Sequence, residues 1–572
     1  MGSVSYISEF QGGKVQKTQK KIEKELRNIE SLLRRQQIGG AEETDNFGTF
    51  VSLITALNKL KENYQPLMTY ARLRLAVDAS DREAAKALGS LEKNLIKLEE
   101  IELRLTSWLA ELPSDFDAGE YALLLAESRV LAGHMMGDAE EILAAELSLI
   151  GRRAWSRLYG NVSSRMTVDL DDEAQPMAVV RNLAYDEDER VRRGAYLAEL
   201  AAWKKYQDEL AACLNGVKGE AVVLVRRRGW PDEIEPTLFD NRISRKTLEA
   251  MLVAVEDSLP VWRRYFAAKA RLLGKEKLDW WDVFAPVGES REWSWDEARS
   301  FIVASLRDFS PGAAELAERA FSENWIDAEP RAGKRGGAFC APVGGGASRV
   351  LANYGGSFDA VSTLAHELGH AYHNLRLAGR PPLLRRTPMT LAETASIMNE
   401  TVVTQAALGA LSGGQRLAVL DTWLRGAAQV VVDVYSRFIF ESRIFEMRRQ
   451  RELTPEEFSK LMVEAQQQAY GDALNSYHSF MWAVKPHYYG RDFYNYPYIF
   501  GLLFGLGLYT SYLDEPNSFI ESYDALLADT GTADARELAT SFGFDIEDPE
   551  FWRRGMGILT QHIDEFAAAS ET

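Results

Sequence analysis

The stretch VSTLAHELGHAYHNL, Val361–Leu375, contains three of the seven histidines of the chain, His366, His370 and His373. Apolar residues at helical spacing surround them, which predicts a helix. Its central residues HELGH match the HExxH pattern. In a helix, His366 and His370 lie one turn apart on the same face, about 6 Å along the axis. Two imidazole nitrogens at that spacing can share one zinc ion, and Glu367 lies where it can polarise a water molecule that the metal holds.

A catalytic zinc needs a third protein ligand, and Glu393 is the candidate. It lies in the first turns of a second expected helix, PMTLAETASIMNETVV (388–403), beyond a proline-containing loop that lets the chain turn back. His373 lies about 10 Å along the axis from His366, too far to share the ion, and is expected in the pocket wall. Glu400 either orients a ligand histidine or lies on the surface, and its spacing fits both.

The alternative is a surface helix with an ordinary His–Glu pair. Clustering argues against it, because five of the seven histidines fall between residues 366 and 487. A buried group of charged side chains also needs compensation, which a metal supplies.

The segment 477–498, YHSFMWAVKPHYYGRDFYNYPY, has six tyrosines and two histidines in 22 positions. An aromatic core element explains several of them. A peptidase also needs hydrogen-bond donors for the oxyanion and the substrate backbone. His487, Tyr494, Tyr496 and Tyr498 are the candidate catalytic donors, and their spacing leaves open which of them acts.

Two further segments flank the histidine helix. Residues 333–358 are glycine-rich and contain two strand-like runs, GAFCAPV and SRVLANY, which predict a hairpin that turns at the three glycines 344–346. After the HExxH motif come four arginines. They either belong to a solvated loop or bind the carboxylate of a peptide. They are Arg376, Arg380, Arg385 and Arg386.

Most of the remaining sequence has helical periodicity, so the fold class is mainly α. We expect an N-terminal helical domain over 1–180 and a catalytic domain over 181–572. The long charge-rich stretch 186–229 is interpreted as solvated helix surface.

Composition narrows the class of protein. The 572 residues are enough for two or more domains. The net charge of −18, without a dense basic block, makes nucleic acid an unlikely partner. Cys213 and Cys340 form no CxxC motif and favour a cytoplasmic location. The N-terminus lacks the pattern of a signal peptide. The most apolar run, 498–509, is too short for a membrane span. Gly501 and Gly505 within it are therefore interpreted as sites of close helix packing.

Together, LAHELGHAYH, the upstream GKRGGAFC and VLANYGGSFDAVSTLAHE, the downstream LAETASIMNE and the late PHYYGRDFYNYPY resemble the thimet-type zinc oligopeptidases, in particular their oligoendopeptidase F branch. The resemblance covers roughly 180–570. It implies a prolate fold with two halves around a deep central channel and a small sheet beside the HExxH helix. It also implies His366, His370 and Glu393 as ligands of one zinc ion and Glu367 as general base.

The resemblance further implies a late His/Tyr segment that donates to the tetrahedral intermediate. Here the tyrosines are more tightly spaced than in thimet-type members. The hairpin is expected to bind extended peptide by strand addition.

The sequence therefore predicts a zinc metallo-endopeptidase that hydrolyses short, unfolded oligopeptides. Two rivals remain, a zinc hydrolase of a non-peptide amide and a non-catalytic peptide-binding protein on the same scaffold. The sequence carries no signal for an oligomeric state.

Overall fold

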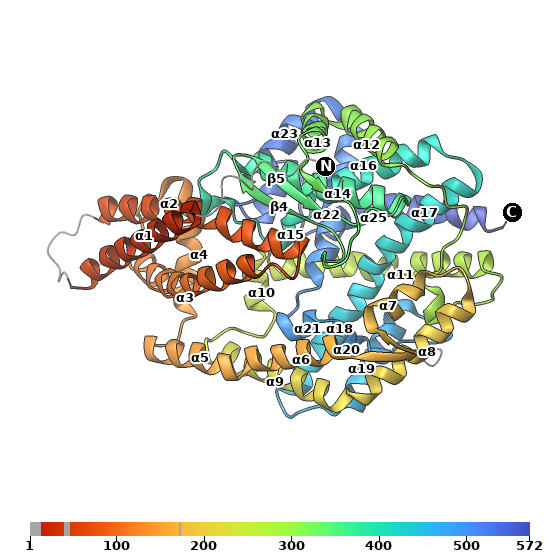
Figure 1. Ribbon diagram of the computed structural model, residues 1–572, viewed down its shortest axis with the longest axis horizontal. Coiled ribbons are helices and arrows are strands. Elements are labelled where there is room, and N and C mark those ends of the chain that lie inside the picture. The colour runs from red at the N-terminus through yellow and green to blue at the C-terminus, as the bar shows by residue number, and fades with distance from the viewer. Residues whose placement is uncertain (1–12, 39–45, 171–172, 572) are drawn as a thin grey trace.

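The chain folds mainly into α-helices, as its periodicity predicts (Figure 1). The computed structural model describes residues 13–38, 46–170 and 173–571. The first helices are α1 (Gly13–Ile38), α2 (Asn46–Val77), α3 (Arg82–Ala110) and α4 (Ala122–Gly133). They are followed by α5 (Asp138–Ile150), α6 (Arg152–Arg165), β1 (Thr167–Leu170), β2 (Glu173–Pro176), α7 (Met177–Asn182), α8 (Glu189–Lys205), α9 (Gln207–Arg227), α10 (Glu235–Asp240) and α11 (Arg245–Leu272).

The second half of the chain carries the histidine helix, α14. Its elements are α12 (Trp295–Phe309), α13 (Pro311–Ser322), β3 (Ile326–Asp327), β4 (Phe339–Gly344), β5 (Ala347–Leu351), α14 (Phe358–Leu377), α15 (Met389–Ala392), α16 (Thr394–Ala410), α17 (Gly413–Ala428), α18 (Val434–Arg448), α19 (Pro455–Tyr470), α20 (Met481–Val484), α21 (His487–Gly490), α22 (Tyr496–Asp514), α23 (Pro516–Asp529), α24 (Ala535–Thr540) and α25 (Pro549–Ala569). Short turns add the 3-10 helices η2 (Gly119–Tyr121), η3 (Leu183–Tyr185), η4 (Trp280–Asp282) and η5 (Pro382–Arg385), and the π-helical segment η6 (Gln429–Asp433).

Two hydrophobic cores divide the described residues. The smaller one runs from Ile22 to Leu125 and holds α1–α4 together, and the larger one runs from Tyr159 to Phe566. Figure 1 shows α1–α4, in red and orange, at one end of an elongated molecule. The expected domain boundary at residue 180 stays a prediction. Because Tyr159 and Val180 pack in the larger core, we propose that the division lies between the two cores instead.

The larger part has two helical layers in the view of Figure 1. Helices α12–α14, α16, α17, α22, α23 and α25 lie in the upper layer, and α5–α9 and α18–α21 in the lower one. The apolar run 498–509 lies inside α22, most of whose residues are buried. Among the described residues, no helix is long and apolar enough to cross a membrane.

The predicted hairpin is present beside the histidine helix. Strands β4 and β5 pair antiparallel, with Phe339 opposite Leu351, and both contact α14. The turn uses Gly345 and Gly346 at φ of 59° and 76°, values that favour glycine. Strand β3 adds to β5 in parallel, so β4 forms the edge of this small sheet.

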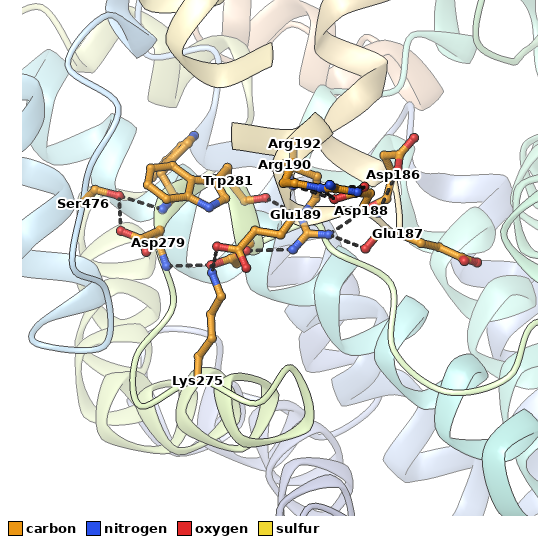
Figure 2. Close-up of polar contacts among 12 residues, drawn as sticks. Asp186, Glu187, Asp188, Glu189, Arg190, Arg192, Lys275, Asp279, Trp281 and Ser476 are labelled. Atoms are coloured by element: carbon orange, nitrogen blue, oxygen red, sulfur yellow. Dashed lines mark hydrogen bonds and ion pairs between the residues drawn. The ribbon is translucent and has the colours of Figure 1, made fainter. Parts of the chain in front are cut away.

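The interpretation of 186–229 as solvated surface is wrong for several charged residues. Arg192 on α8 is 3 % exposed and Asp282 of η4 is fully buried. The guanidinium of Arg192 donates to Asp282 at 2.8 Å, and the Lys275 ammonium donates to the same carboxylate at 2.6 Å (Figure 2). Lys275 also pairs with Glu189. These ion pairs join the start of α8 to η4 and to the segment that follows α11, and the two pairs made by Asp282 are buried.

Candidate metal centre

Two packed helices bring together the three predicted metal ligands. His366 and His370 project from α14, and Glu393 lies at the junction of α15 and α16. The Glu393 Oε2 atom lies 3.2 Å from His366 Nε2 and 3.4 Å from His370 Nε2. One ligand atom from each of the three residues falls within 4.8 Å of the others. The structure therefore brings together the whole predicted ligand set.

The spacing of these atoms fits a zinc ion. Four ligands arranged tetrahedrally at bond lengths near 2.0–2.1 Å lie about 3.3 Å from one another. The two measured separations, 3.2 and 3.4 Å, bracket that value. The three side chains keep about a fifth to a quarter of their surface exposed, so the site can be reached from solvent. Three ligands with an open side are the donor set of a catalytic zinc site.

Glu400 contacts a ligand histidine. Its Oε2 atom lies 3.0 Å from His366 Nδ1. A proton on Nδ1, donated to Glu400, leaves the lone pair of Nε2 free for a metal. Of the two interpretations of Glu400, the structure therefore supports the one in which it orients the ring.

The cluster is strongly coupled electrostatically. Burial alone acts to lower the pKa of His366, but its hydrogen bonds with Glu393 and Glu400 raise that pKa well above its usual range. Burial likewise acts to raise the pKa of Glu393, but hydrogen bonds with His366 and His370 hold it well below its usual range. The carboxylate thus stays charged and ready to bind a cation.

Glycines allow the helices to approach closely enough to form this cluster. A Cβ atom on Gly369 would lie 2.3 Å from the carbonyl oxygen of Ala395, so α14 and α16 touch backbone to backbone there. On α22, a Cβ atom on Gly501 would lie 2.8 Å from the Cβ of Glu393, and one on Gly505 would meet Ile397 at 2.7 Å. The interpretation of these two α22 glycines as close packing is confirmed.

Glu367 lies next to the ligands in a buried position. It is 6 % exposed, and within the described part of the chain its Oε2 atom has no hydrogen-bond partner. Burial raises the pKa of this carboxyl above its usual value, while a hydrogen bond from the backbone of Cys340 on β4 acts against the shift. A carboxylate with one free oxygen and a raised pKa has the properties of a general base.

His373 lies outside the ligand cluster, as the spacing predicts. Its Nε2 atom lies 2.8 Å from Thr530 Oγ1, and its ring also bonds to the backbone of Ala392. Burial, assisted by the charge of His370, lowers the pKa of His373 to about 4. The residue therefore ties α14 to the chain just before Glu393.

Three of the four candidate donors lie together. The His487 ring stacks on Tyr494 with centroids 5.0 Å apart, and Tyr498 lies 6.2 Å from His487 and 5.9 Å from Tyr494. We call His487, Tyr494 and Tyr498 the late cluster. The pKa of Tyr498 is raised by burial, by Tyr494 and by the charge of Glu393, so this phenol lies within electrostatic reach of the metal ligands. Burial and the nearby charges of Arg437 and Lys485 lower the pKa of His487 to about 4.

Tyr496 lies elsewhere. Its ring is fully buried, and its hydroxyl donates to the Thr237 carbonyl at 3.1 Å and accepts from Asn241 at 3.2 Å. The structure does not bring it to the late cluster, because Tyr496 starts α22 on the side that packs against α10. We leave it out of the proposed donor set.

Sequence reasoning missed the residues that hold the late cluster. The ammonium of Lys218 donates to Glu441 at 2.5 Å and to Asp492 at 2.9 Å, and Arg152 donates to Asp492 at 2.7 Å. The backbone N–H of Phe493, just before the first tyrosine of the cluster, donates to Glu441 at 2.9 Å. Phe493 has φ of 47°, which is uncommon outside glycine, so these buried ion pairs hold the backbone in an unfavourable conformation.

A cleft adjoins the two clusters. A cavity of about 820 Å³ is lined by Ala392 and Tyr494, among others. It shares Trp230, Asp240 and Arg386 with a second cavity of about 740 Å³ that reaches α3 and α4. The deep central channel that the resemblance implies stays a prediction.

The four arginines that follow the HExxH motif have different contacts. Arg376 and Arg380 pair with Asp524 and Asp529 on α23, and Arg385 donates to backbone carbonyls. Arg386, whose side chain is 71 % exposed, lines both cavities. Of the four arginines, Arg386 is therefore the one best placed to contact a peptide.

The helical scaffold holds two histidines and a glutamate in the arrangement of metal ligands, with the carboxylate of Glu367 beside them. This arrangement is that of a metallopeptidase. Residues 182–558 match the model of Peptidase family M3, and the chain belongs to that family. Its relatives place it in the oligoendopeptidase F branch, so the chain is a metalloendopeptidase that acts on oligopeptides.

Individual relatives span most of the chain. It is 21 % identical to Oligopeptidase PepF of Bacillus subtilis, over 95 % of this chain and 84 % of the relative. It is 26 % identical to Group B oligopeptidase PepB of Streptococcus agalactiae, over 75 % and 72 %. The solved oligoendopeptidase-F of Enterococcus faecium has a TM-score of 0.71 at 18 % identity and covers 97 % of this chain and 99 % of its own, which shows a shared fold.

Proposed function

We propose that this metallo-oligopeptidase is a zinc enzyme that cleaves short, unfolded peptides with Glu367 as general base. The observation that carries the proposal is the ligand geometry: Glu393 lies at tetrahedral separations of 3.2 and 3.4 Å from the two histidine nitrogens, beside a buried carboxylate with a free oxygen. A zinc ion bound there supplies Lewis acidity for the scissile carbonyl and for water.

The side chains of this chain supply the remaining chemistry. Glu367 takes a proton from the attacking water and then delivers it to the leaving amine. Tyr498, with Tyr494 or His487, donates a hydrogen bond to the oxygen of the scissile carbonyl as negative charge develops there. The proximity of Tyr498 to the metal ligands supports this assignment, because the charge of Glu393 acts on the Tyr498 hydroxyl.

Substrate binding uses the sheet edge and the cleft. Strand β4 lies at the edge of its sheet, and its Cys340 contacts Glu367, so a peptide paired with β4 runs past the general base. A cytoplasmic location stays part of the proposal.

The test uses Glu367→Gln, which keeps the shape of the side chain and removes the base. We expect bound zinc to remain near one per chain while hydrolysis of quenched peptides falls by about 10²–10⁴-fold. Glu393→Ala should instead lose zinc. Glu315→Gln, at an exposed position on α13, is the matched control. Near-normal turnover by Glu367→Gln would falsify the assignment of the base.

The same assay separates the rival functions. A panel of peptides of increasing length, with and without a chelator, should show chelator-sensitive cleavage of the short peptides. A hydrolase of non-peptide amides would cleave none of them, and a binding protein would bind them intact.

A further inference from the structure

A third cavity, lined by charged and aromatic side chains, lies apart from the metal centre. It measures about 100 Å³ and lies between α7, α8, η4, η6 and α20. Its lining includes Arg181, Glu199, Trp281, His478 and Lys485, and it includes none of the metal ligands and no residue of the late cluster.

The walls of this cavity are fixed by buried ion pairs and hydrogen bonds. The pairs of Arg192 and Lys275 with Asp282 hold η4 against α8. On the other side, Ser476 donates to Asp279 at 3.0 Å and accepts from the backbone of Trp280, which fixes the chain that leads to α20 (Figure 2). The cavity is therefore a preorganised space.

Its cations outnumber their available partners. Arg181 pairs with Glu199 at 3.4 Å, and Arg425 pairs with Asp421 at 3.5 Å. The side chain of Lys485 has no hydrogen bond or ion pair within the described part of the chain, and only its backbone N–H is bonded, to the Met481 carbonyl at 3.3 Å. Burial, with the charge of Arg437, lowers the pKa of Lys485 to about 7, although the charges of Asp433 and Glu199 act in the opposite direction.

Two further side chains on the wall have polar atoms without partners. The indole N–H of Trp281 is a donor without an acceptor, and neither ring nitrogen of His478 has a hydrogen-bond partner among the described residues. His478 is 1 % exposed. Its Nε2 atom lies 3.5 Å from a carboxylate oxygen of Glu199. A buried polar atom without a partner is costly, and a bound group that accepts hydrogen bonds removes the cost.

Size limits what can fill the space. A volume of about 100 Å³ corresponds to roughly three water molecules. A whole amino-acid residue does not fit, whereas a carboxylate with one or two carbon atoms does. Such an ion supplies both the missing negative charge and two acceptor oxygens.

We propose that this cavity binds a small carboxylate anion of the formate or acetate class, with Lys485 as its counter-ion and Trp281 as a second donor. The site is separate from the peptidase centre. Because Lys485 lies two residues before His487, occupancy is also expected to alter turnover, a consequence that rests on the proposed function.

Binding is measured without hydrolysis. Formate or acetate is titrated into the full chain at constant ionic strength, kept with sodium sulfate, while tryptophan fluorescence and the thermal midpoint are followed. Trp280 and Trp281 line the cavity and report on its occupancy. We expect a saturable fluorescence change and a rise in the midpoint.

Variants locate the site. Lys485→Met should weaken binding at least tenfold. Trp281→Phe should weaken it by roughly three- to tenfold, and its binding is measured through the thermal midpoint. Lys460→Met is the charge-matched control, because that side chain is 76 % exposed on α19, and it should bind like the wild type.

Three results overturn the proposal. They are a wild-type response that does not saturate, an unchanged affinity in both cavity variants, and a chloride titration with the same midpoint as formate. If Lys485→Met fails to fold, the Trp281→Phe titration decides alone. A chain that binds the anion but lacks hydrolysis would refute only the peptidase mechanism.

Discussion

Gly369, in the middle of the HELGH motif, should be as important for the metal site as the ligands themselves. A Cβ atom at this position would lie 2.3 Å from the Ala395 carbonyl oxygen and 2.5 Å from Ser396 Cα. Both atoms belong to the backbone of α16 and cannot rotate away. In Gly369→Ala, α14 and α16 must therefore separate by about 1 Å to reach an ordinary contact.

The metal site cannot absorb such a shift. Glu393 moves with α16, whereas His366 and His370 stay on α14, and their separations of 3.2 and 3.4 Å already match a tetrahedral site. Metal–ligand distances tolerate about 0.2 Å. We expect zinc affinity to fall by at least 10- to 100-fold, and the free energy of unfolding to fall by about 1–3 kcal/mol through overpacking.

The assay is a zinc competition titration against a chromogenic chelator, with thermal unfolding and peptide hydrolysis at saturating zinc. Gly409→Ala is the control, because Gly409 lies near the end of the same helix α16 with no atom within 4 Å of a new Cβ. That variant should keep its zinc and gain up to about 1 kcal/mol from better helix propensity. If Gly369→Ala binds zinc within threefold of the wild type and keeps normal turnover, the close helix contact does not control the site.

Three further outcomes are expected. Glu400→Ala should lower zinc affinity by about 10–100-fold without loss of fold, measured by the same competition, because His366 loses the acceptor that orients it. Tyr498→Phe should lower kcat by about 10²–10³-fold, whereas Tyr496→Phe should leave kcat unchanged and cost about 1 kcal/mol in urea unfolding; equal kcat losses would contradict the placement of the two rings. His373 has a pKa of about 4 when folded and about 6.5 when unfolded, so the unfolded chain binds the extra proton and stability falls as the pH drops from 6.5 to 4, by up to about 3 kcal/mol. In His373→Gln this acid-induced loss of stability should be smaller, as measured by unfolding experiments at each pH. An unchanged pH profile would show that His373 does not contribute to the acid sensitivity.

The metal ligands could be predicted because their geometry is local. His366 and His370 are fixed by one turn of helix, and Glu393 follows at the junction of α15 and α16, beyond the proline-containing loop. The contact of Glu400 with His366 was left open, because it depends on the angle between α14 and α16. That angle is set by the close approach at Gly369, and the sequence alone gives no distance between the two helices.

The donors could be predicted only as a group. Tyr494 lies in a loop and Tyr498 in the first turn of α22, so two residues that are four apart face the same cluster. Tyr496, two residues from each, points to the other side. A shift of two residues in the start of α22 would exchange these roles, because each residue turns about 100° around the helix axis, and assignments of helix ends differ by one or two residues.

The buried ion pairs could not be found from periodicity, because each depends on a partner far away in the chain. Arg192 and Asp282 are 90 residues apart, and Lys218 and Asp492 are 274 apart. In a sequence with helical periodicity, such residues cannot be distinguished from charged residues on the solvent-exposed face.

The two halves of the proposed active site are held by different forces. The ligand cluster rests on close packing of α14, α16 and α22 at Gly369, Gly501 and Gly505, and such contacts are short-ranged. The late cluster rests on Lys218, Glu441 and Asp492, whose charges are desolvated and stabilise the loop only as a complete set. Loss of one partner leaves a buried charge uncompensated, so damage to this network should disorder the donors while the metal ligands stay in place. The active site is therefore expected to fail in two separable ways, by loss of metal or by loss of oxyanion donors with the metal still bound.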